Sequence, residues 1–149
     1  MDPMRECFNA RATVAGEACG EALVSRMPLS LWGGLDPKSG KVTDVRHDLF
    51  GQCVSGKVLF VPEGKGSSSS SSVLLETIRA GTAPAAIVNV VTEPILATGS
   101  IIGRVLYGRT VPIFTLDRED YARVNTGDRV TVTMLRSHLA ALIVDRLAQ

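Results

Sequence analysis

The sequence predicts an α/β fold, either a β/α sandwich or a partly closed barrel, that contains parallel β-α-β units. Residues 57–114 alternate short apolar runs of strand length with segments of helix length, which is typical of right-handed parallel β-α-β units. Segments with strand character lie on both sides of this alternation. Because 149 residues is the usual size of one domain, we expect residues 1–149 to form a single domain.

Strand and turn signals are mixed in the part of the chain that precedes this alternation. Residues 21–30 (EALVSRMPLS) combine β-branched and apolar side chains with a proline near the end, so we expect a short strand there, paired with residues 12–15. Residues 31–40 (LWGGLDPKSG) contain Asp36-Pro37 and several glycines, which favour turns and predict long loops.

The alternating part is predicted to contain three strands and two helices. Each strand is a short apolar run next to turn residues, and the runs lie at residues 57–61, 85–91 and 110–114. A helix at 73–80 (VLLETIRA) has its apolar side chains on one face and is followed by Gly81, a common residue just past a helix. A second helix at 93–106 has Pro94 in its first turn and is interrupted by Gly99 and Gly103.

The last part of the chain is predicted to return to strands. We expect a short helix at 119–124, a turn at 126–128 and a half-exposed strand at 129–134, because apolar and polar residues alternate there. The tail leaves two alternatives open. Its apolar residues have helical spacing, but a closing strand at 142–144 fits the same periodicity.

Composition limits the classes of partner. Sixteen basic and fifteen acidic residues give a formal charge of +1 with no long block of one sign, which argues against a nucleic-acid binder but is compatible with a small anionic ligand. No apolar stretch is long enough for a membrane span, and residues 1–11 lack the apolar core of a signal peptide. We therefore expect a cytoplasmic protein with no membrane partner.

The three cysteines have neither disulfide-framework nor metal-pair spacing. Cys7, Cys19 and Cys53 are separated by 12 and 34 positions. We expect each to be a small buried apolar side chain in a reducing compartment.

The most informative stretch is residues 64–72 (GKGSSSSSS), which follow a predicted buried strand and precede a predicted helix. Open α/β sheets bind ligands at the carboxyl ends of their strands. Glycines there allow the backbone to approach a ligand closely, and the N-terminus of the following helix presents free N–H groups. The alternatives are a flexible serine-rich linker or serines that only cap the helix. Because apolar segments begin close by on both sides, a compact ligand-contacting loop is favoured.

Known motifs fit this stretch poorly. The P-loop spacing is absent, and a dinucleotide-binding pattern finds Ser69 where the third glycine belongs and Asn89 where an acidic residue belongs. His47 and His138 are the only histidines and no GxSxG sequence is present, so a Ser-His-Asp hydrolase is unsupported. We interpret each histidine as structural or solvated.

Three longer segments carry a family resemblance. They are EALVSRMPLSLWGGLDPKSGKVTD (21–44), HDLFGQCVSGKVLFVPEGKGSSSSSSVLLE (47–76) and AGTAPAAIVNVVTEPILATGSIIG (80–103). From about Gly20 to Gly127 the chain resembles the small swivelling domain of the aconitase X family in its separate-subunit form. The resemblance implies a swivelling β/β/α domain that docks on a large catalytic subunit, with a hydro-lyase site between the two. It also implies that the iron or iron-sulfur cluster is carried by cysteine ligands of the large subunit and not by this chain.

The resemblance also implies the site residues. In the wider aconitase superfamily a serine of a GSS-type loop is the base, which carries over to Ser67, with Gly66 and Ser68 as substrate contacts and no metal ligand in this chain. A serine hydroxyl is a poor base, so the site must stabilise its alkoxide, and a helix N-terminus with Lys65 nearby offers N–H groups and positive charge.

One position departs from the aconitase pattern. Aconitases proper place an arginine after the paired serines, where this chain has Ser69. The group that anchors a substrate carboxylate is therefore unassigned, and Arg46 and Arg104 stay outside the predicted site because surface arginines are usually solvated.

The substrate is a small hydroxy acid under this resemblance. Known members dehydrate cis-3-hydroxy-L-proline in bacteria or phosphomevalonate in archaea. The extensions before Gly20 and after Met134 favour hydroxyproline, whereas the stretch 92–95 (TEPI) resembles the archaeal form. The alternatives are a phosphomevalonate dehydratase subunit and, from another class, a non-catalytic phosphate- or nucleotide-binding module.

A glycine-rich loop predicts a contact with the partner. Leu31, Trp32 and Leu35 lie in this loop, and Trp32 is the one tryptophan of the chain. Two interpretations stay open, in which these side chains either form an exposed docking surface or cover the core.

Overall fold

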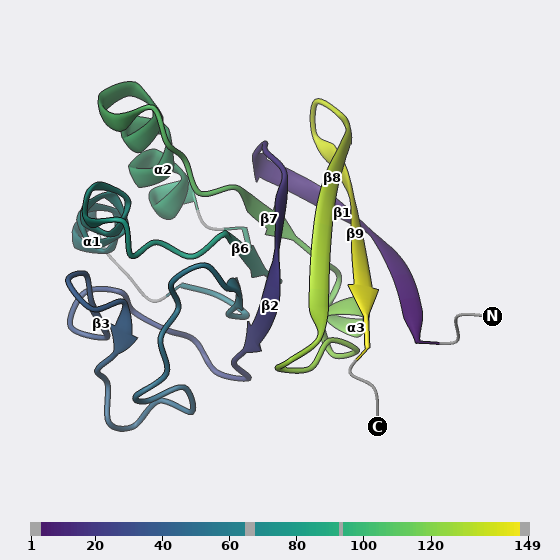
Figure 1. Cartoon of the computed structure of the whole chain (residues 1–149), viewed down its shortest axis with the longest axis horizontal. Helices are drawn as coiled ribbons and strands as arrows, with labels where there is room; N and C mark the ends of the chain where they lie inside the picture. Colours follow the sequence, from purple (N-terminus) through teal and green to yellow (C-terminus); the bar gives the residue numbers. More distant parts are fainter. Residues whose placement is uncertain (1–3, 65–67, 93, 147–149) are drawn as a thin grey trace.

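The computed structural model describes residues 4–64, 68–92 and 94–146. Within these residues, seven strands form a closed barrel in the order β1-β7-β6-β5-β2-β8-β9, with β9 paired back to β1. Figure 1 shows the barrel beside a layer of two helices and a long loop. The prediction of a barrel with parallel β-α-β units is confirmed, and the barrel is closed rather than partly closed. The strands are β1 (Arg5–Val14), β2 (Ala18–Val24), β5 (Val58–Phe60), β6 (Ala86–Asn89), β7 (Ile113–Thr115), β8 (Arg129–Arg136) and β9 (Leu139–Asp145).

The barrel has a parallel and an antiparallel part. Strands β2, β5, β6 and β7 are parallel neighbours, with Leu23 opposite Leu59, Leu59 opposite Ile87, and Ile87 opposite Ile113. Strands β1, β8 and β9 pair in antiparallel fashion and close the barrel. The parallel strands β5, β6 and β7 are buried throughout, which explains why they read as continuous apolar runs in the sequence.

The predicted pairing of residues 21–30 with residues 12–15 is wrong. Strand β1 pairs with β7 and β9, whereas β2 pairs with β5 and β8. The link between β1 and β2 is no hairpin turn, because the two strands are not paired with each other. The start of this link continues beside β7: Val14 is opposite Ile113, and a Cβ atom built on Gly16 would lie 2.7 Å from Pro112 Cγ.

The two alternatives for the tail are resolved in favour of a strand. β9 is hydrogen-bonded to β8 on one side and to β1 on the other, so it completes the barrel wall. Its residues alternate between buried and half-buried positions. The apparent helical spacing arises because Leu135 is exposed near the β8–β9 turn and belongs to no apolar face.

Two helices flank the parallel strands. Helix α1 (Ser68–Ala80) ends before Gly81, whose φ of 78° suits a glycine, and α2 (Pro94–Tyr107) packs against α1. A Cβ on Gly99 would lie 2.5 Å from the Ser71 carbonyl oxygen, and a Cβ on Gly103 would lie 2.7 Å from Ile78 Cδ1. The glycines that interrupt the sequence pattern are therefore the points of closest approach between the helices.

The remaining elements are short. Helix α3 (Arg118–Tyr121) follows β7, and the predicted loop region contains a two-stranded sheet of β3 (Leu35–Asp36) and β4 (Lys41–Val42). In that loop the side chain of Trp32 is 65% exposed, whereas Leu31 and Leu35 are buried in the core. The loop thus combines both interpretations, with one exposed aromatic and two core leucines. In the described part of the chain, no helix has the length and hydropathy needed to cross a membrane.

The expectation of buried cysteines is wrong. Cys7 and Cys19 are exposed and Cys53 is half-buried, and all three are free thiols. Cys7 and Cys19 occupy outward positions of β1 and β2, next to Phe8 and Gly20, which are buried. The alternation of a strand, which the spacing of the cysteines does not reveal, decides their exposure.

Candidate functional site

The carboxyl edge of the parallel strands is where both helices begin. Strand β5 is followed in the sequence by α1, whose first residue is Ser68. After β6 the chain leads to Pro94, the first residue of α2. Two helices therefore begin at one edge of the barrel, so the positive ends of both helix dipoles lie there (Figure 1).

The residues predicted for catalysis follow Gly64 in the sequence, and the structure describes few of them. Gly66 and Ser67, together with Lys65, lie outside the described residues, and Ser68 is described only as the first position of α1. Their roles therefore stay predictions. The loop connects a strand end to a helix N-terminus, as the sequence predicts.

The segment that enters the loop is held on two sides. Leu29 forms a parallel bridge with Gly64, and the Leu29 N–H donates to the Glu63 carbonyl oxygen at 3.4 Å. On the other side, the N–H groups of Val90 and Val91 donate to the Pro62 carbonyl at 2.8 and 3.1 Å. The backbone that leads into the serine loop is thus fixed between the segments that follow β2 and β6.

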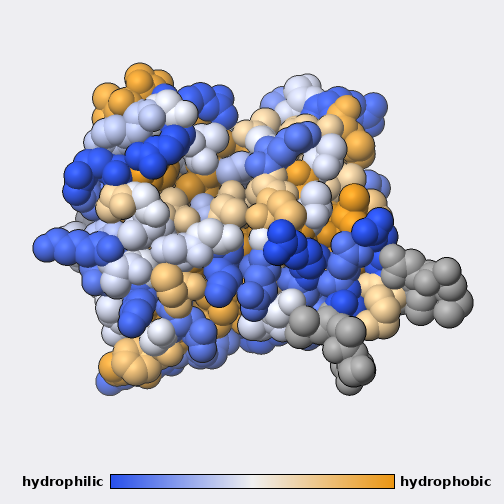
Figure 2. Space-filling view, in the orientation of Figure 1, coloured by the Kyte–Doolittle hydropathy of each residue, from blue (hydrophilic) through white to orange (hydrophobic). Residues whose placement is uncertain are grey.

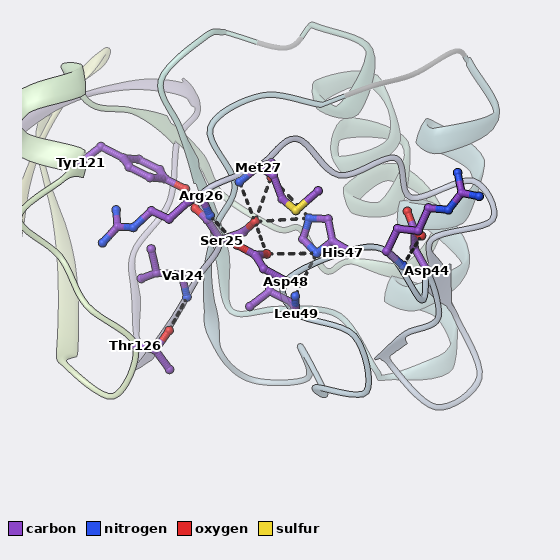
Figure 3. A network of polar contacts seen from close by, with 11 residues as sticks. Val24, Ser25, Arg26, Met27, Asp44, His47, Asp48, Leu49, Tyr121 and Thr126 are labelled. Carbon is purple, nitrogen blue, oxygen red and sulfur yellow. Dashed lines mark hydrogen bonds and ion pairs between the residues drawn. The ribbon is translucent and has the colours of Figure 1, made fainter.

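A partly buried polar network, in which Ser25 and His47 are buried and Asp48 is exposed, holds the segment that follows β2 (Figure 3). The Ser25 hydroxyl lies 2.6 Å from Asp48 Oδ1, 3.2 Å from His47 Nε2 and 2.8 Å from the Met27 carbonyl oxygen. The second carboxylate oxygen of Asp48 accepts the Arg26 N–H at 2.9 Å. Asp48 Oδ1 also lies 3.3 Å from His47 Nδ1.

This network contains the three residue types of a hydrolase triad, but its hydrogen bonds give them another role. His47 Nδ1 accepts the Leu49 N–H at 3.1 Å, which places the proton of a neutral ring on Nε2, facing the Met27 carbonyl oxygen at 3.3 Å. A ring nitrogen that carries a proton cannot accept one from Ser25, and the Ser25 hydroxyl is directed to Asp48 instead. The prediction that His47 is structural is supported, and His138 is exposed.

Helix α3 supports the same segment from the barrel side. The Tyr121 hydroxyl donates to the Ser25 carbonyl oxygen at 2.7 Å, and burial raises the pKa of Tyr121. The Arg26 guanidinium lies 5.9 Å from the centre of the Tyr121 ring and donates to the Val124 carbonyl at 3.0 Å. The sequence predictions do not include this network. Its signal in the sequence is the adjacent His47-Asp48 pair within a turn-rich segment.

One serine of the predicted loop has an unusual environment. Ser70 is 4% exposed, and its hydroxyl has no hydrogen-bond partner among the residues that the structure describes. Ser70 lies on the same helix face as Leu74 and Thr77, which are four and seven positions further and are buried. In the described part of the serine run, Ser70 and Ser71 are buried, whereas Ser72 is exposed.

The two arginines that the sequence leaves unassigned lie on different segments. The Arg104 guanidinium donates to the Ala15 carbonyl oxygen at 3.4 Å, near the carboxyl-terminal end of α2. Arg46 is exposed, and its N–H donates to Asp44 Oδ1 at 3.0 Å.

The described residues do not fit a metal centre. Among them, no group of three or more His, Cys, Asp or Glu side chains could hold a metal ion, and the three cysteines lie on different segments. An iron or iron-sulfur cluster needs several such ligands converging on one point. The side chains in the described part of this chain therefore do not provide the ligand set of an iron group.

The fold and the carboxyl edge of its parallel strands define a class of protein. It is a barrel-type α/β domain with a serine loop at a helix N-terminus. Residues 7–141 match the family described as the aconitase X swivel domain. The chain belongs to that family, as the resemblance of its sequence predicts.

Relatives in the family carry two names. The chain is 48% identical over 106 residues to a protein of Pseudomonas aeruginosa named cis-3-hydroxy-L-proline dehydratase, covering 71% of this chain but only 18% of that protein. It is 38% identical over 136 residues to a protein of Methanosarcina mazei named phosphomevalonate dehydratase small subunit, covering 91% of this chain and 90% of that one. The domain thus occurs both within a much longer chain and as a separate subunit.

A solved structure has the same fold. The crystal structure of Thermococcus kodakaraensis aconitase X in its holo-form superposes with a TM-score of 0.81 at 36% identity, covering 93% of this chain and 98% of that one. The swivelling-domain fold predicted from the resemblance is confirmed by this match.

Proposed function

We propose that this chain is the small subunit of an aconitase X-type dehydratase, a hydro-lyase whose active site forms between it and a large subunit. The observation that carries the proposal is the serine loop at the N-terminus of α1, entered by a backbone held between the segments that follow β2 and β6. Family membership supports it, as do the dehydratase names of the relatives. We expect the complex to act in the cytoplasm.

In this proposal Ser67 is the base. Its alkoxide takes a proton from the substrate carbon next to the carbon that bears the hydroxyl group. The hydroxyl group then leaves with a proton as water, and a carbon–carbon double bond forms. The positive end of the α1 dipole and the charge of Lys65 stabilise the alkoxide, while Gly66 and Ser68 contact the substrate.

We assign the iron or iron-sulfur cluster to the large subunit, because the described residues of this chain do not fit one. In a dehydration such a group supplies a Lewis acid for the leaving hydroxyl. The part of this chain is then to bring the base and oriented N–H groups to a substrate held between the subunits.

For the substrate we propose cis-3-hydroxy-L-proline, converted to a pyrroline carboxylate. The support is the identity to the Pseudomonas protein, 48% against 38% to 43% for the phosphomevalonate dehydratase small subunits of Methanosarcina mazei and Thermococcus onnurineus. Phosphomevalonate is the second candidate, since the Methanosarcina subunit aligns over 90% of its own length.

The test is reconstitution with the large subunit encoded nearest to this chain. We expect the complex to dehydrate cis-3-hydroxy-L-proline and the isolated chain to be inactive. Turnover of phosphomevalonate alone would replace the substrate and keep the reaction class. If the complex dehydrates neither compound, and the isolated chain binds inorganic phosphate or a nucleotide by calorimetry, the dehydratase proposal is wrong and the binding-module alternative replaces it.

A further inference from the structure

The outer surface of α2 is apolar. Five large apolar side chains lie within seven consecutive positions of this helix and are all partly or largely exposed, with Val105 at 77% and Leu106 at 60%. Four of them, Ile101, Ile102, Val105 and Leu106, share one side of the helix, and we call these four residues the α2 face. Tyr107 lies four positions after the buried Gly103, on the other side. Figure 2 shows hydrophobic side chains gathered over this end of α2, at the upper left of the molecule.

The opposite side of the same helix is already used for packing. Leu96, Ala97, Gly99, Ser100 and Gly103 are buried on that side. The helix therefore has apolar side chains on its outer surface as well as on its packed side, although Thr98 and Arg104 are also exposed on it. An exposed apolar cluster of this kind is typical of a contact with another molecule. The other large exposed apolar residues of the described chain do not form such a run along one element, which distinguishes α2.

The charge carried by α2 itself is positive. Helix α2 contains no acidic residue within Pro94–Tyr107, and its one charged residue, Arg104, is exposed. A surface that covers the α2 face and complements this charge is itself apolar with acidic side chains at its margin.

We propose that the α2 face docks on the large subunit of the dehydratase, an inference that rests on the proposed function. In the Pseudomonas relative the matched region is 18% of the protein, so there the domain is covalently joined to a much larger body. A second argument is continuity, because α2 begins at the same barrel edge as the serine loop. A partner that covers this loop and extends along α2 reaches the α2 face.

The test uses two charge substitutions and a matched control. Val105→Glu and Leu106→Glu place a carboxylate on the α2 face, and Leu135→Glu places one near the β8–β9 turn, at a leucine of similar exposure (56%). Because all three side chains are exposed, we expect the free subunits to keep the circular dichroism spectrum and melting temperature of the wild type. Affinity for the purified large subunit is then measured by calorimetry and size-exclusion chromatography.

We expect wild type and Leu135→Glu to bind equally, and each α2 variant to bind at least about tenfold more weakly. Wild-type binding of the α2 variants would overturn the docking proposal and leave the proposed function intact. If the wild-type chain forms no complex, both fail. If the isolated chain forms a dimer that Val105→Glu dissociates while binding of the large subunit is unchanged, the occupant of the α2 face is a second copy and the proposal is overturned.

Discussion

The interior of the barrel and the layer between the barrel and its helices are both buried, but they differ in chemistry. The barrel interior is filled by apolar side chains such as Phe60, Phe114 and Leu142. The helix-side layer also has an apolar centre, yet it contains buried polar residues such as Ser70 and Ser100. The same parallel strands contribute to both, since alternate residues face opposite sides.

Because of this difference, we expect the barrel interior to determine stability and the helix-side layer to carry the proposed site. The barrel interior is apolar and closed by hydrogen-bonded strands on all sides, so it needs no partner. The helix-side layer ends at the edge where the serine loop begins, and it leaves the α2 face exposed. We therefore expect substitutions on the two sides to affect different measurements.

The largest effect is expected for Ser67→Ala. If Ser67 is the base, kcat of the reconstituted complex should fall about 10²- to 10⁴-fold, while the free energy of unfolding changes by at most about 1 kcal/mol, the worth of a lost helix cap. The measurements are steady-state kinetics and thermal melting, with unchanged iron content and subunit association as controls.

Ser69→Ala and Ser71→Ala are the matched variants and should be milder. Near-normal turnover by Ser67→Ala together with an inactive Ser68→Ala would move the base to Ser68. Full activity in all these variants would remove the loop from the mechanism.

Leu142→Ala should lower the free energy of unfolding and leave turnover unchanged, the opposite of Ser67→Ala. Leu142 is fully buried in the barrel interior, so its truncation leaves a cavity and should cost about 2–5 kcal/mol of unfolding free energy. The turnover number per folded complex should stay unchanged, because no residue of the proposed site is altered. Urea denaturation with parallel kinetics checks this, and a kcat that falls as far as in Ser67→Ala would show that the two regions are not separate.

How far the sequence predicts this structure depends on whether the decisive contacts are local. Residues 57–61 and 85–91 are correctly predicted as buried strands, because an apolar run between turn residues is a local signal. The pairing of β2 is not predicted, because barrel closure depends on contacts between distant segments. The two alternatives for the tail cannot be separated from the sequence for the same reason.

The site is predictable in part. The position of the loop between a strand and a helix follows from local pattern, and the structure agrees with it. The Ser25–His47–Asp48 network is not predicted, because residues 22 and 23 positions apart meet only when the long loop packs against the segment after β2.

Gly99→Ala tests the contact between the helices. Alanine favours a helix, but a Cβ at this position would lie 2.5 Å from the Ser71 carbonyl oxygen, so α1 and α2 must move apart. We expect a net loss of about 1–3 kcal/mol of unfolding free energy. Thr98→Ala, on the exposed side of the same helix, is the control and should be close to neutral. Equal stability of both variants would mean that the close contact imposes no restraint.

Ser100→Ala removes a hydroxyl that is fully hydrogen-bonded. Ser100 Oγ lies 2.6 Å from Thr110 Oγ1 and 2.6 Å from the Val111 carbonyl oxygen, and it accepts the Val111 N–H at 2.9 Å. Its loss leaves buried backbone groups of Val111 without this partner, so we expect a cost of about 1–2 kcal/mol by chemical denaturation. A neutral result would show that water replaces the hydroxyl.

Ser70→Ala should have the smallest effect and the opposite sign. Both serines are buried in helices on the same side of the barrel, but the Ser70 hydroxyl has no partner to lose. Burial of an unpaired hydroxyl is unfavourable, and alanine has the higher helix propensity, so the variant should be more stable by about 0.5–1 kcal/mol. Chemical denaturation of Ser70→Ala and Ser100→Ala under identical conditions gives the comparison directly. A loss of more than about 1 kcal/mol in Ser70→Ala would mean that its hydroxyl is paired in solution, because only a lost hydrogen bond produces that cost at a site where alanine leaves little empty volume.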